Sequence, residues 1–415
     1  MRYVLITYLP FSLTEKGRFR VDIDGWYWDL KAHIDHFEDL HVFAPMKEEK
    51  IPDNEELTNV FSSDEIQFHP LPYFENNAKI KDQTKFLFNL PKIISIIGRE
   101  IKKDDIIHST GAAIPPLGLA VNFVCFLKGY KKRLLVLDAD FISDLDLYSK
   151  TSQNIFSKGF YKLLKTCYYP IFKYSIKKTP LTLVGGENLL QRYSDNGNVV
   201  KYKTSWIKGK DIISEAQLSK KIKNSSDECI NLCFSATLIP KKNPACAIET
   251  VKILKKRGIR CKLDILPIPF NGDTLEEELK ELIKKYGLSD IVNIWGIVPY
   301  GEPFYKAIRE HDIILVPNLS DEEPRIIYDA MANGTVVIGS NSKGFAIISS
   351  NKNGILCNPD DPECFADAVE KLYNNRNMLS KIALNGLETI KNNTIEKMHY
   401  SRKKHIIETF QGHSN

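Results

Sequence analysis

Short β-rich runs alternate with amphipathic helical stretches along most of this chain, and this alternation limits its fold more than any other feature. A strand can pair in parallel with the next strand only after a crossover, which is usually a helix, so the pattern predicts parallel sheets covered by helices on both faces. In the first half, the predicted strands are residues 2–7, 41–44, 106–108, 133–137 and 181–185. The predicted helices of that half are residues 25–37, 86–103 and 117–128.

The second half repeats the alternation, with a stretch rich in Lys, Ser and Asn before it that we interpret as a linker, residues 207–228. The predicted strands of this half are residues 230–235, 260–266, 291–295, 312–316 and 335–339. The predicted helices are residues 244–257, 273–286, 302–310, 364–373 and 382–389. We therefore predict an α/β fold of two doubly wound, Rossmann-like domains facing a cleft. The predicted parts are domains 1–206 and 229–393, and a C-terminal helix at about 394–415 that packs back on the first domain.

Composition excludes several classes of protein. The net charge of +5 over 415 residues is too small to indicate a nucleic-acid partner. No run reaches the roughly 18 apolar residues of a membrane span, and residues 1–11 are interpreted as a strand and not as a signal peptide. The eight cysteines form no C-x-x-C pair, so we expect reduced thiols, a cytoplasmic protein and no zinc site. The chain has no G-x-G-x-x-G, P-loop, H-E-x-x-H or G-x-S-x-G motif, which argues against the enzymes that depend on them.

The richest stretch of motifs is 312–359, where a buried strand is followed by an acidic loop and a helix that Pro324 is expected to start. Two carboxylates, Asp321 and Asp329, lie eight residues apart in it. A carboxylate accepts two hydrogen bonds from vicinal hydroxyl groups, which are the groups that a ribose or a hexose offers. The alternative is that both carboxylates only cap or solvate the start of a helix.

This stretch resembles the signature of glycosyltransferase family 4, P-S-x-x-E-G-F-P-x-x-x-x-E-A-M-A-x-G-x-P-V-I. The family comprises retaining glycosyltransferases of the GT-B fold. The resemblance implies that Asp329 holds the ribose hydroxyls of a nucleotide-sugar and that Asp321 holds its hexose hydroxyls. The donor-binding run between them is then Glu322, Glu323, Pro324 and Arg325, with Glu322-Glu323 in place of the family's Gly-Phe pair.

Two further matches lie in the same half. Residues 234–243, FSATLIPKKN, resemble the family's F-V-G-R-L-x-P-x-K-G, which implies that Lys242 stabilises the leaving diphosphate. Thr237 replaces the family's Arg, so another cation such as Arg325 would have to substitute for it; the alternative is that Lys242 is an ordinary surface lysine. Residues 292–299, VNIWGIVP, resemble V-x-F-x-G-x-V-P, whose backbone reads the nucleobase, here at Gly296, Ile297 and Val298. The resemblance favours UDP as the nucleotide.

The first half resembles the family in outline only. Asp138 follows a predicted strand at the place of the family's His near the reacting anomeric carbon, and Gly25, His108 and Gly185 are assigned to the acceptor side. Asp138 and Asp140 also form a D-x-D pair, which is the metal-binding motif of a different class of glycosyltransferase. His33 and His36 share a helix face, and we interpret them as surface or cleft histidines and not as metal ligands.

Cations and aromatic residues interleave over residues 148–178. This segment is either a surface for anionic lipid headgroups or a helix pair with a solvated basic face and an aromatic core side. The sequence therefore predicts an enzyme that moves a sugar from a nucleotide-sugar, with UDP favoured, to a glycan or lipid-linked acceptor with retention. It needs no obligatory metal or cofactor, and it is cytoplasmic or peripheral on the inner face of a membrane. The alternatives are a metal-dependent glycosyltransferase using Asp138 and Asp140, and a catalytically silent binding protein of the same fold.

Overall fold

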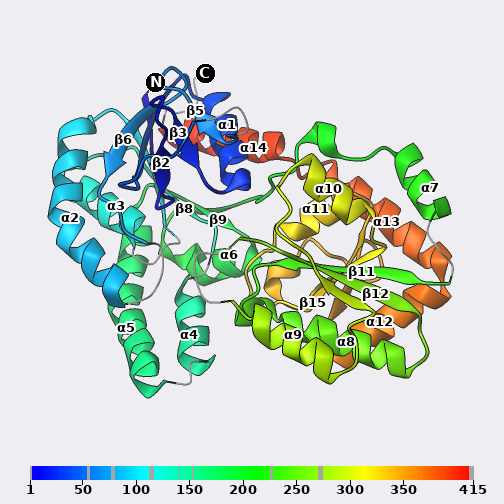
Figure 1. Cartoon of the computed structure of the whole chain (residues 1–415). Coiled ribbons are helices and arrows are strands. Elements are labelled where there is room, and N and C mark those ends of the chain that lie inside the picture. The colour runs from blue at the N-terminus through cyan, green and yellow to red at the C-terminus, as the bar shows by residue number, and fades with distance from the viewer. Residues whose placement is uncertain are drawn as a thin grey trace. The chain divides into compact units, whose positions relative to one another are not determined.

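The computed structural model describes residues 2–53, 57–75, 80–111, 116–139, 141–151, 154–224, 228–269 and 274–410. The chain forms two compact units (Figure 1). Unit 1 comprises Met1–Thr204 together with Glu396–Asn415, and unit 2 comprises Ser205–Ile395.

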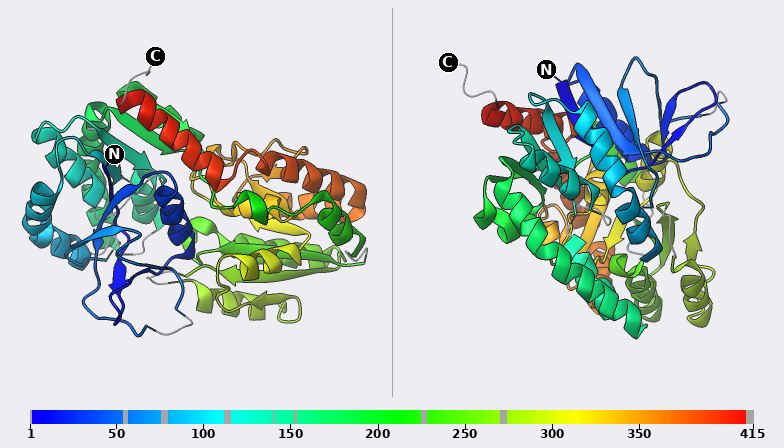
Figure 2. Two further views of the ribbon diagram at one scale, coloured as in Figure 1. Left: turned by 90° about the horizontal axis from the view of Figure 1, so that it is seen from above. Right: turned by 90° about the vertical axis from the view of Figure 1, so that its left-hand side faces the viewer.

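Unit 1 is built on a seven-stranded parallel sheet in the order β10-β9-β8-β7-β1-β4-β6. Its strands are β1 (Arg2–Ile6), β4 (Asp39–Pro45), β6 (Gln67–Leu71), β7 (Ile106–Thr110), β8 (Arg133–Leu137), β9 (Leu181–Gly185) and β10 (Val199–Tyr202). Its helices are α1 (Asp24–Ile34), α2 (Ile80–Glu100), α3 (Leu117–Leu127), α4 (Phe141–Thr151), α5 (Ile155–Lys178), α6 (Glu187–Tyr193), the short η1 (Ser194–Asn196) and α14 (Ile395–Phe410). β2 (Phe11–Leu13), β3 (Phe19–Val21) and β5 (Val60–Phe61) form a second, small antiparallel sheet (Figure 2). It packs on β6 of the large sheet, where the rings of Phe11 and Phe19 lie 4.9 and 4.6 Å from that of Phe68.

Unit 2 is built on a six-stranded parallel sheet in the order β13-β12-β11-β14-β15-β16. Its strands are β11 (Ile230–Ala236), β12 (Cys261–Pro267), β13 (Val292–Ile294), β14 (Ile313–Val316), β15 (Val336–Ser340) and β16 (Ile355–Cys357). Its helices are α7 (Glu215–Asn224), α8 (Pro244–Lys256), α9 (Glu276–Lys285), α10 (Glu302–Arg309), α11 (Ile326–Ala332), α12 (Pro362–Asn374) and α13 (Arg376–Ile390), with the short turns η2 (Gly209–Asp211), η3 (Pro240–Lys242) and η4 (Lys343–Phe345).

The predicted fold class, α/β with two doubly wound units, is confirmed. Every residue of the inner strands β7, β8, β9, β14 and β15 is buried, which is what a parallel sheet with helices on both faces requires. The sequence patterns did not indicate the small sheet, β6, β10 or β16. These strands are short or lie at a sheet edge, and β6 has polar and partly exposed residues, so none shows a continuous apolar run.

The stretch 207–228 is not a free linker, which corrects our interpretation of it. It belongs to unit 2 and contains α7. Ile213 and Leu218 are buried in the same hydrophobic cluster as β11 and α11, and the backbone N–H of Ile213 donates to the carbonyl of Ala332 at 3.0 Å. The segment is mostly polar and only its few apolar residues are buried. The sequence therefore does not show that it packs against unit 2.

The last helix, α14, is part of unit 1, where a buried polar network connects it to α1. His399 Nε2 lies 3.0 Å from an Asp29 oxygen, and Arg402 lies 2.9 Å from His33 Nε2 and 3.6 Å from Asp29. Burial alone would raise the pKa of Asp29, but Arg402, His33 and His399 together hold it well below its usual value. These charges compensate one another inside the unit.

Replacing Arg402 with Met should therefore destabilise the protein by about 3–5 kcal/mol, because it leaves the buried Asp29 carboxylate without its strongest partner. The measurement is urea unfolding, with Lys404→Met as the control because Lys404 lies on the same helix with a side chain that is 60% exposed. Equal unfolding midpoints for the two variants would contradict the role of the network.

Candidate functional site

The sheet of unit 2 has a topological switch point between β11 and β14. The chain leaves β11 for β12 on one side, and it returns to β14 on the other side. In open parallel sheets, ligands bind in the crevice beyond the carboxyl ends of two such strands. The loops that follow β11 and β14 are joined there, because the backbone N–H of Leu319 donates to the carbonyl of Lys241 at 2.9 Å.

Two lysines and one glutamate meet at this switch point. Glu322, from the loop after β14, accepts hydrogen bonds from Lys241 at 3.1 Å and from Lys242. The three side chains are only 12–16% exposed. Burial alone would raise the pKa of Glu322, but the two ammonium groups hold it below its usual range, so the carboxylate is ionised. The group therefore carries two positive charges and one negative charge in a half-buried place.

Asn243 turns the chain from these lysines into α8. Its φ of 52° lies in the left-handed region that favours glycine and tolerates asparagine, and its side-chain amide donates to the carbonyl of Pro359 at 2.9 Å. This conformation explains why asparagine can replace the glycine of the family motif. Pro244 then begins α8, so Lys241 and Lys242 stand beside the positive end of a 13-residue helix.

The loop that carries Glu322 is pressed against Gly344. A Cβ atom at this glycine would lie 2.2 Å from the Glu322 carbonyl oxygen and 2.6 Å from that of Asp321. Both contacts are with backbone atoms, which cannot rotate away. Glycine at position 344 therefore determines how close this acidic loop lies to η4.

Asp329 lies on α11, the helix that follows the same loop, and is only 5% exposed. Its carboxylate accepts a hydrogen bond of 2.9 Å from the Tyr300 hydroxyl. Burial raises the pKa of Asp329 to about 7, although Tyr300 and Arg325 both oppose the rise. The guanidinium of Arg325 stacks over Trp206, with 3.8 Å between its central carbon and the ring centroid.

The loop after β13 carries Gly296, Ile297 and Val298. Gly296 is exposed, and a Cβ atom there would meet no other atom within 4 Å, so the packing of the chain itself does not require a glycine. Ile297 is 62% exposed, which is unusual for a large apolar side chain. The loop leaves room for a ligand at this edge of the sheet.

The other predicted donor residues lie in the two loops at the switch point. Thr237 follows β11 directly, and Asp321 and Glu323 flank Glu322. The Glu323 carboxylate accepts a hydrogen bond from the Tyr328 hydroxyl. The structure thus brings together Lys242, Glu322 and the loops that the resemblance assigned to the donor.

In unit 1, Asp138 follows β8, Gly185 is the last residue of the neighbouring strand β9, and the two lie together. A Cβ atom at Gly185 would be 3.6 Å from the Asp138 Cα. Asp138 accepts a hydrogen bond from the Tyr202 hydroxyl, and Gly25 is buried near the start of α1. His108 is only 2% exposed and lies 2.8 Å from the Tyr3 hydroxyl, so its side chain is not displayed at a surface. Its burial gives no support to an acceptor-side role.

Asp140, the second carboxylate of the D-x-D pair, lies outside the described residues. Within the described ranges, the one group of three side chains close enough to share a metal ion is Asp29, His33 and His399. His33 is fully buried, which is contrary to our expectation of a surface or cleft histidine. Both its ring nitrogens have partners, the Asp29 carbonyl and Arg402, and a guanidinium repels a cation, so this group does not fit a metal site.

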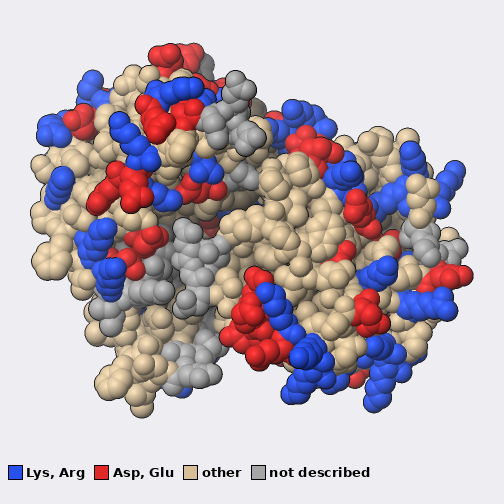
Figure 3. Space-filling view, viewed as in Figure 1, with Lys and Arg blue, Asp and Glu red and all other residues tan. Residues whose placement is uncertain are grey.

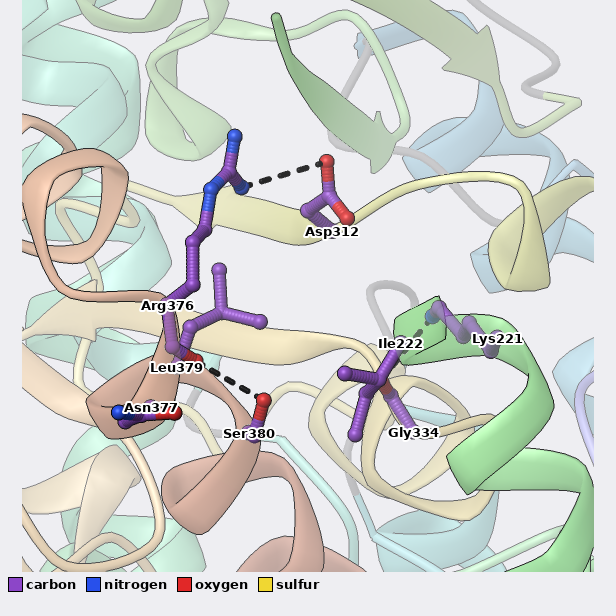
Figure 4. Close-up of a pocket in the computed structure, with 8 residues that line it drawn as sticks. All are labelled: Lys221, Ile222, Asp312, Gly334, Arg376, Asn377, Leu379 and Ser380. Atoms are coloured by element: carbon purple, nitrogen blue, oxygen red, sulfur yellow. Dashed lines mark hydrogen bonds and ion pairs between the residues drawn. The ribbon is translucent and has the colours of Figure 1, made fainter. Parts of the chain in front are cut away.

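A small cavity of unit 2 lies at the other end of the sheet (Figure 4). It is lined by Lys221, Ile222, Asp312, Gly334, Arg376, Asn377, Leu379 and Ser380. Asp312 comes just before β14, so the cavity opens at the amino ends of the strands and is separate from the switch point. Burial lowers the pKa of Lys221 to about 7, and its ammonium donates to the carbonyls of Asn333 and Gly334 and to the Thr335 hydroxyl. Lys221 therefore connects α7 to the turn after α11 through these hydrogen bonds.

The sequence patterns did not single out Lys241, Tyr300, Trp206 or Gly344. Lys241 lies within the motif at 234–243 and Tyr300 directly follows the one at 292–299, so their positions were a usable signal. Trp206 is more than a hundred residues from Arg325 along the chain, and only the fold brings the two together. The need for glycine at position 344 follows only from its short distance to the backbone of the acidic loop, which the sequence does not show.

Comparison with known proteins shows that the second half of the chain is similar to glycosyltransferases. Residues 215–389 match the family model of the glycosyl transferases group 1. Over 156 residues the chain is 26% identical to D-inositol 3-phosphate glycosyltransferase of Paenarthrobacter aurescens, covering 37% of this chain and 38% of that one. Over 142 residues it is 29% identical to the putative colanic acid biosynthesis glycosyltransferase WcaL of Escherichia coli, covering 32% of this chain and 34% of that one. These matches thus span little more than a third of each relative.

Similarities that extend over most of the chain have a lower sequence identity. Protein CapJ of Staphylococcus aureus is 21% identical over 86% of this chain and 83% of its own length. Among solved structures, sucrose-phosphate synthase from Thermosynechococcus elongatus has a TM-score of 0.71 at 16% identity, with 99% of each chain covered. HepE from Anabaena in complex with UDP-glucose has a TM-score of 0.67 at 12% identity, again covering 99% of each chain. The chain therefore has the GT-B fold, and its residues 215–389 resemble the glycosyl transferases group 1.

The raised pKa of Asp329 predicts a pH-dependent stability. Because its folded value of about 7 lies above its ordinary value of 3.8, this group contributes stability at low pH that is lost as the pH rises through 7. Asp329→Asn, which keeps the shape without the charge, should therefore melt at a higher temperature than the wild type at about pH 8 and at a similar temperature at about pH 4. Differential scanning calorimetry of both proteins measures this, and a difference independent of pH would contradict it.

Proposed function

We propose that this protein is a glycosyltransferase that moves a sugar from a nucleotide-sugar, with UDP as the favoured nucleotide, to an acceptor hydroxyl with retention at the anomeric carbon. The observation that carries the proposal is the pair Lys241 and Lys242 at the switch point of unit 2, beside the start of α8. Positive charge at this place suits a leaving diphosphate.

In the proposed reaction, the bond between the anomeric carbon and the diphosphate oxygen breaks. A bond to the acceptor oxygen forms on the same face, and the acceptor proton is released. Lys242 and the N-terminus of α8 offset the charge that grows on the diphosphate. Asp329 accepts the ribose hydroxyls, Asp321 accepts those of the sugar, and the loop at Gly296 faces the base. We assign to Arg325, which is stacked on Trp206, the positive charge that an arginine at position 237 would supply.

The acceptor is assigned to unit 1, with Asp138 close to the reacting carbon. We propose a growing polysaccharide or a lipid-linked glycan as the acceptor, since WcaL is named for colanic acid biosynthesis. UDP is supported in the same way by HepE, which was solved with UDP-glucose. We expect no obligatory metal and a cytoplasmic location. A metal-dependent reaction through Asp138 and Asp140, and a silent binding protein, are the competing outcomes of the first experiment.

That experiment measures thermal shifts with UDP, GDP, ADP, dTDP and CDP, each with and without EDTA. A nucleotide at about 100 times its Kd stabilises a protein by about 2.7 kcal/mol, which a melting curve resolves. We expect the largest shift with UDP, unchanged by EDTA. Lys242→Ala should remove most of it. Gly296→Val should also reduce it while leaving the melting temperature of the free protein unchanged, because a side chain there meets only open space.

The other outcomes discriminate between the alternatives. A shift that disappears with EDTA supports the metal-dependent reaction, and the absence of any shift supports a silent binding protein. A shift of equal size in Lys242→Ala would overturn the role of this lysine. The configuration of the sugar released from a UDP-sugar, followed by proton NMR from the first turnover, tests retention.

In the free protein, Glu322 accepts hydrogen bonds from both lysines that a diphosphate would need. Its replacement with Gln should therefore lower the melting temperature of the free protein, because two half-buried ammonium groups lose their counter-charge. The same change should enlarge the shift produced by UDP, because the diphosphate then supplies the missing negative charge. Glu323→Gln is the matched control, since this neighbouring carboxylate bonds to Tyr328. A smaller UDP shift in Glu322→Gln than in the control would show that Glu322 helps the donor to bind.

A further inference from the structure

Helix α5 of unit 1 has an unusual composition. It holds Lys158, Lys162, Lys165, Lys173, Lys177 and Lys178 and no acidic residue over its 24 positions. Its inner side is buried in the unit through Leu164, Phe172 and Ile176. The packing of the unit thus accounts for only one side of this helix.

The outer side of α5 is apolar. Phe156 is 85% exposed, Leu163 is 59%, Ile171 is 52% and Tyr174 is 44%. At 3.6 residues per turn, their spacing places all four along one side of the helix, and we call this set the apolar stripe. Single exposed apolar residues are ordinary on a protein surface, but four in a row along one helix are a feature to explain.

Two neighbouring helices extend the stripe. The Phe126 ring of α3 lies 6.2 Å from that of Tyr174, and the next residue, Leu127, is 67% exposed. The Tyr168 hydroxyl of α5 donates to Gln83 of α2 at 3.0 Å, and Leu87, one turn further along α2, is 58% exposed. Phe88 beside it is 86% exposed. Helices α2, α3 and α5 lie together in Figure 1, and Figure 3 shows uncharged side chains over the free end of α5.

Lysines line the stripe. By helical spacing, Lys177 and Lys178 lie closest to the stripe. Lys162 and Lys173 lie along one flank of α5, whereas Lys165 is paired with Asp146 of α4. An apolar stripe bordered by lysines is the arrangement with which an interfacial helix lies in a bilayer surface. The apolar side chains enter the acyl boundary, and the ammonium groups reach the headgroups. A second copy of this chain would instead bring the same lysines against each other, which repels.

We propose that α2, α3 and α5 of unit 1 form a docking surface for an anionic lipid bilayer, with the apolar stripe inserted among the headgroups. Docking there does not depend on the identity of the donor or on catalysis. It would hold unit 1, the acceptor side of the proposed enzyme, at the surface where a lipid-linked acceptor is found.

The test is co-sedimentation of the full chain with vesicles of phosphatidylcholine alone, or with about one third phosphatidylglycerol. The wild type should bind the anionic vesicles at least about tenfold more tightly than the neutral ones and should be released by salt. The double variant Phe156→Ser with Leu163→Ser should lose at least about tenfold in affinity while keeping its melting temperature. Leu384→Ser, an exposed apolar residue of unit 2 at 39%, is the matched control and should bind as the wild type does.

A second pair of variants separates charge from insertion. Lys162→Gln with Lys177→Gln should weaken binding to the anionic vesicles by about fivefold per lysine, whereas Lys284→Gln with Lys285→Gln on α9 should not. Equal binding to both vesicle types, or equal binding by Phe156→Ser with Leu163→Ser and by the wild type, would overturn the proposal. So would a wild-type dimer in light scattering that dissociates in the Phe156→Ser, Leu163→Ser variant, since the stripe would then be an interface between copies.

Discussion

Every strand in the two large sheets runs parallel to its neighbours, and the rest of the molecule depends on this alignment. Parallel strands place all the loops that follow them at one edge of a sheet. In unit 2 this edge gathers the loops after β11, β13 and β14, which come from segments about twenty to eighty residues apart. The edge at the switch point has no helix directly over it, because the chain leaves β11 and enters β14 on opposite sides.

The electrostatics of that edge are divided between two kinds of carboxylate. Glu322 is ionised because two ammonium groups face it, and the group as a whole keeps an excess of positive charge. Asp329 is buried among groups that only partly compensate its charge, so it gains a proton far more readily than an exposed aspartate. A ligand with a diphosphate and a ribose matches both features, since it brings negative charge to the lysines and hydroxyl donors to the aspartate. The two acids, only seven positions apart, therefore contribute in opposite ways.

Unit 1 has charged and polar residues in its interior and large apolar residues on its surface. Histidine, arginine and aspartate are buried between α1 and α14, where Asp29 is paired with His399 and Arg402, and Arg402 contacts His33. Phenylalanine and leucine, which normally fill a core, are exposed along α5. Both arrangements are contrary to the usual distribution of polar and apolar residues. The first is explained by the mutual compensation of charges, and the second is explained if a bilayer covers the helix.

The sequence by itself determined the fold class, most strand positions, and the motif register that places Lys242, Asp321 and Asp329 on one edge of a sheet. These features are local, because they depend on apolar periodicity and on the order of residues in short loops. It did not reveal that 207–228 is part of unit 2, that His33 is buried, or that Trp206 supports Arg325. Each of these depends on a contact between residues far apart in the chain, whose pairing no local pattern encodes. The state of the charges was also decided by the tertiary structure, since the same carboxyl group is ionised beside Lys241 and Lys242 at Glu322 and partly protonated at Asp329, where burial dominates.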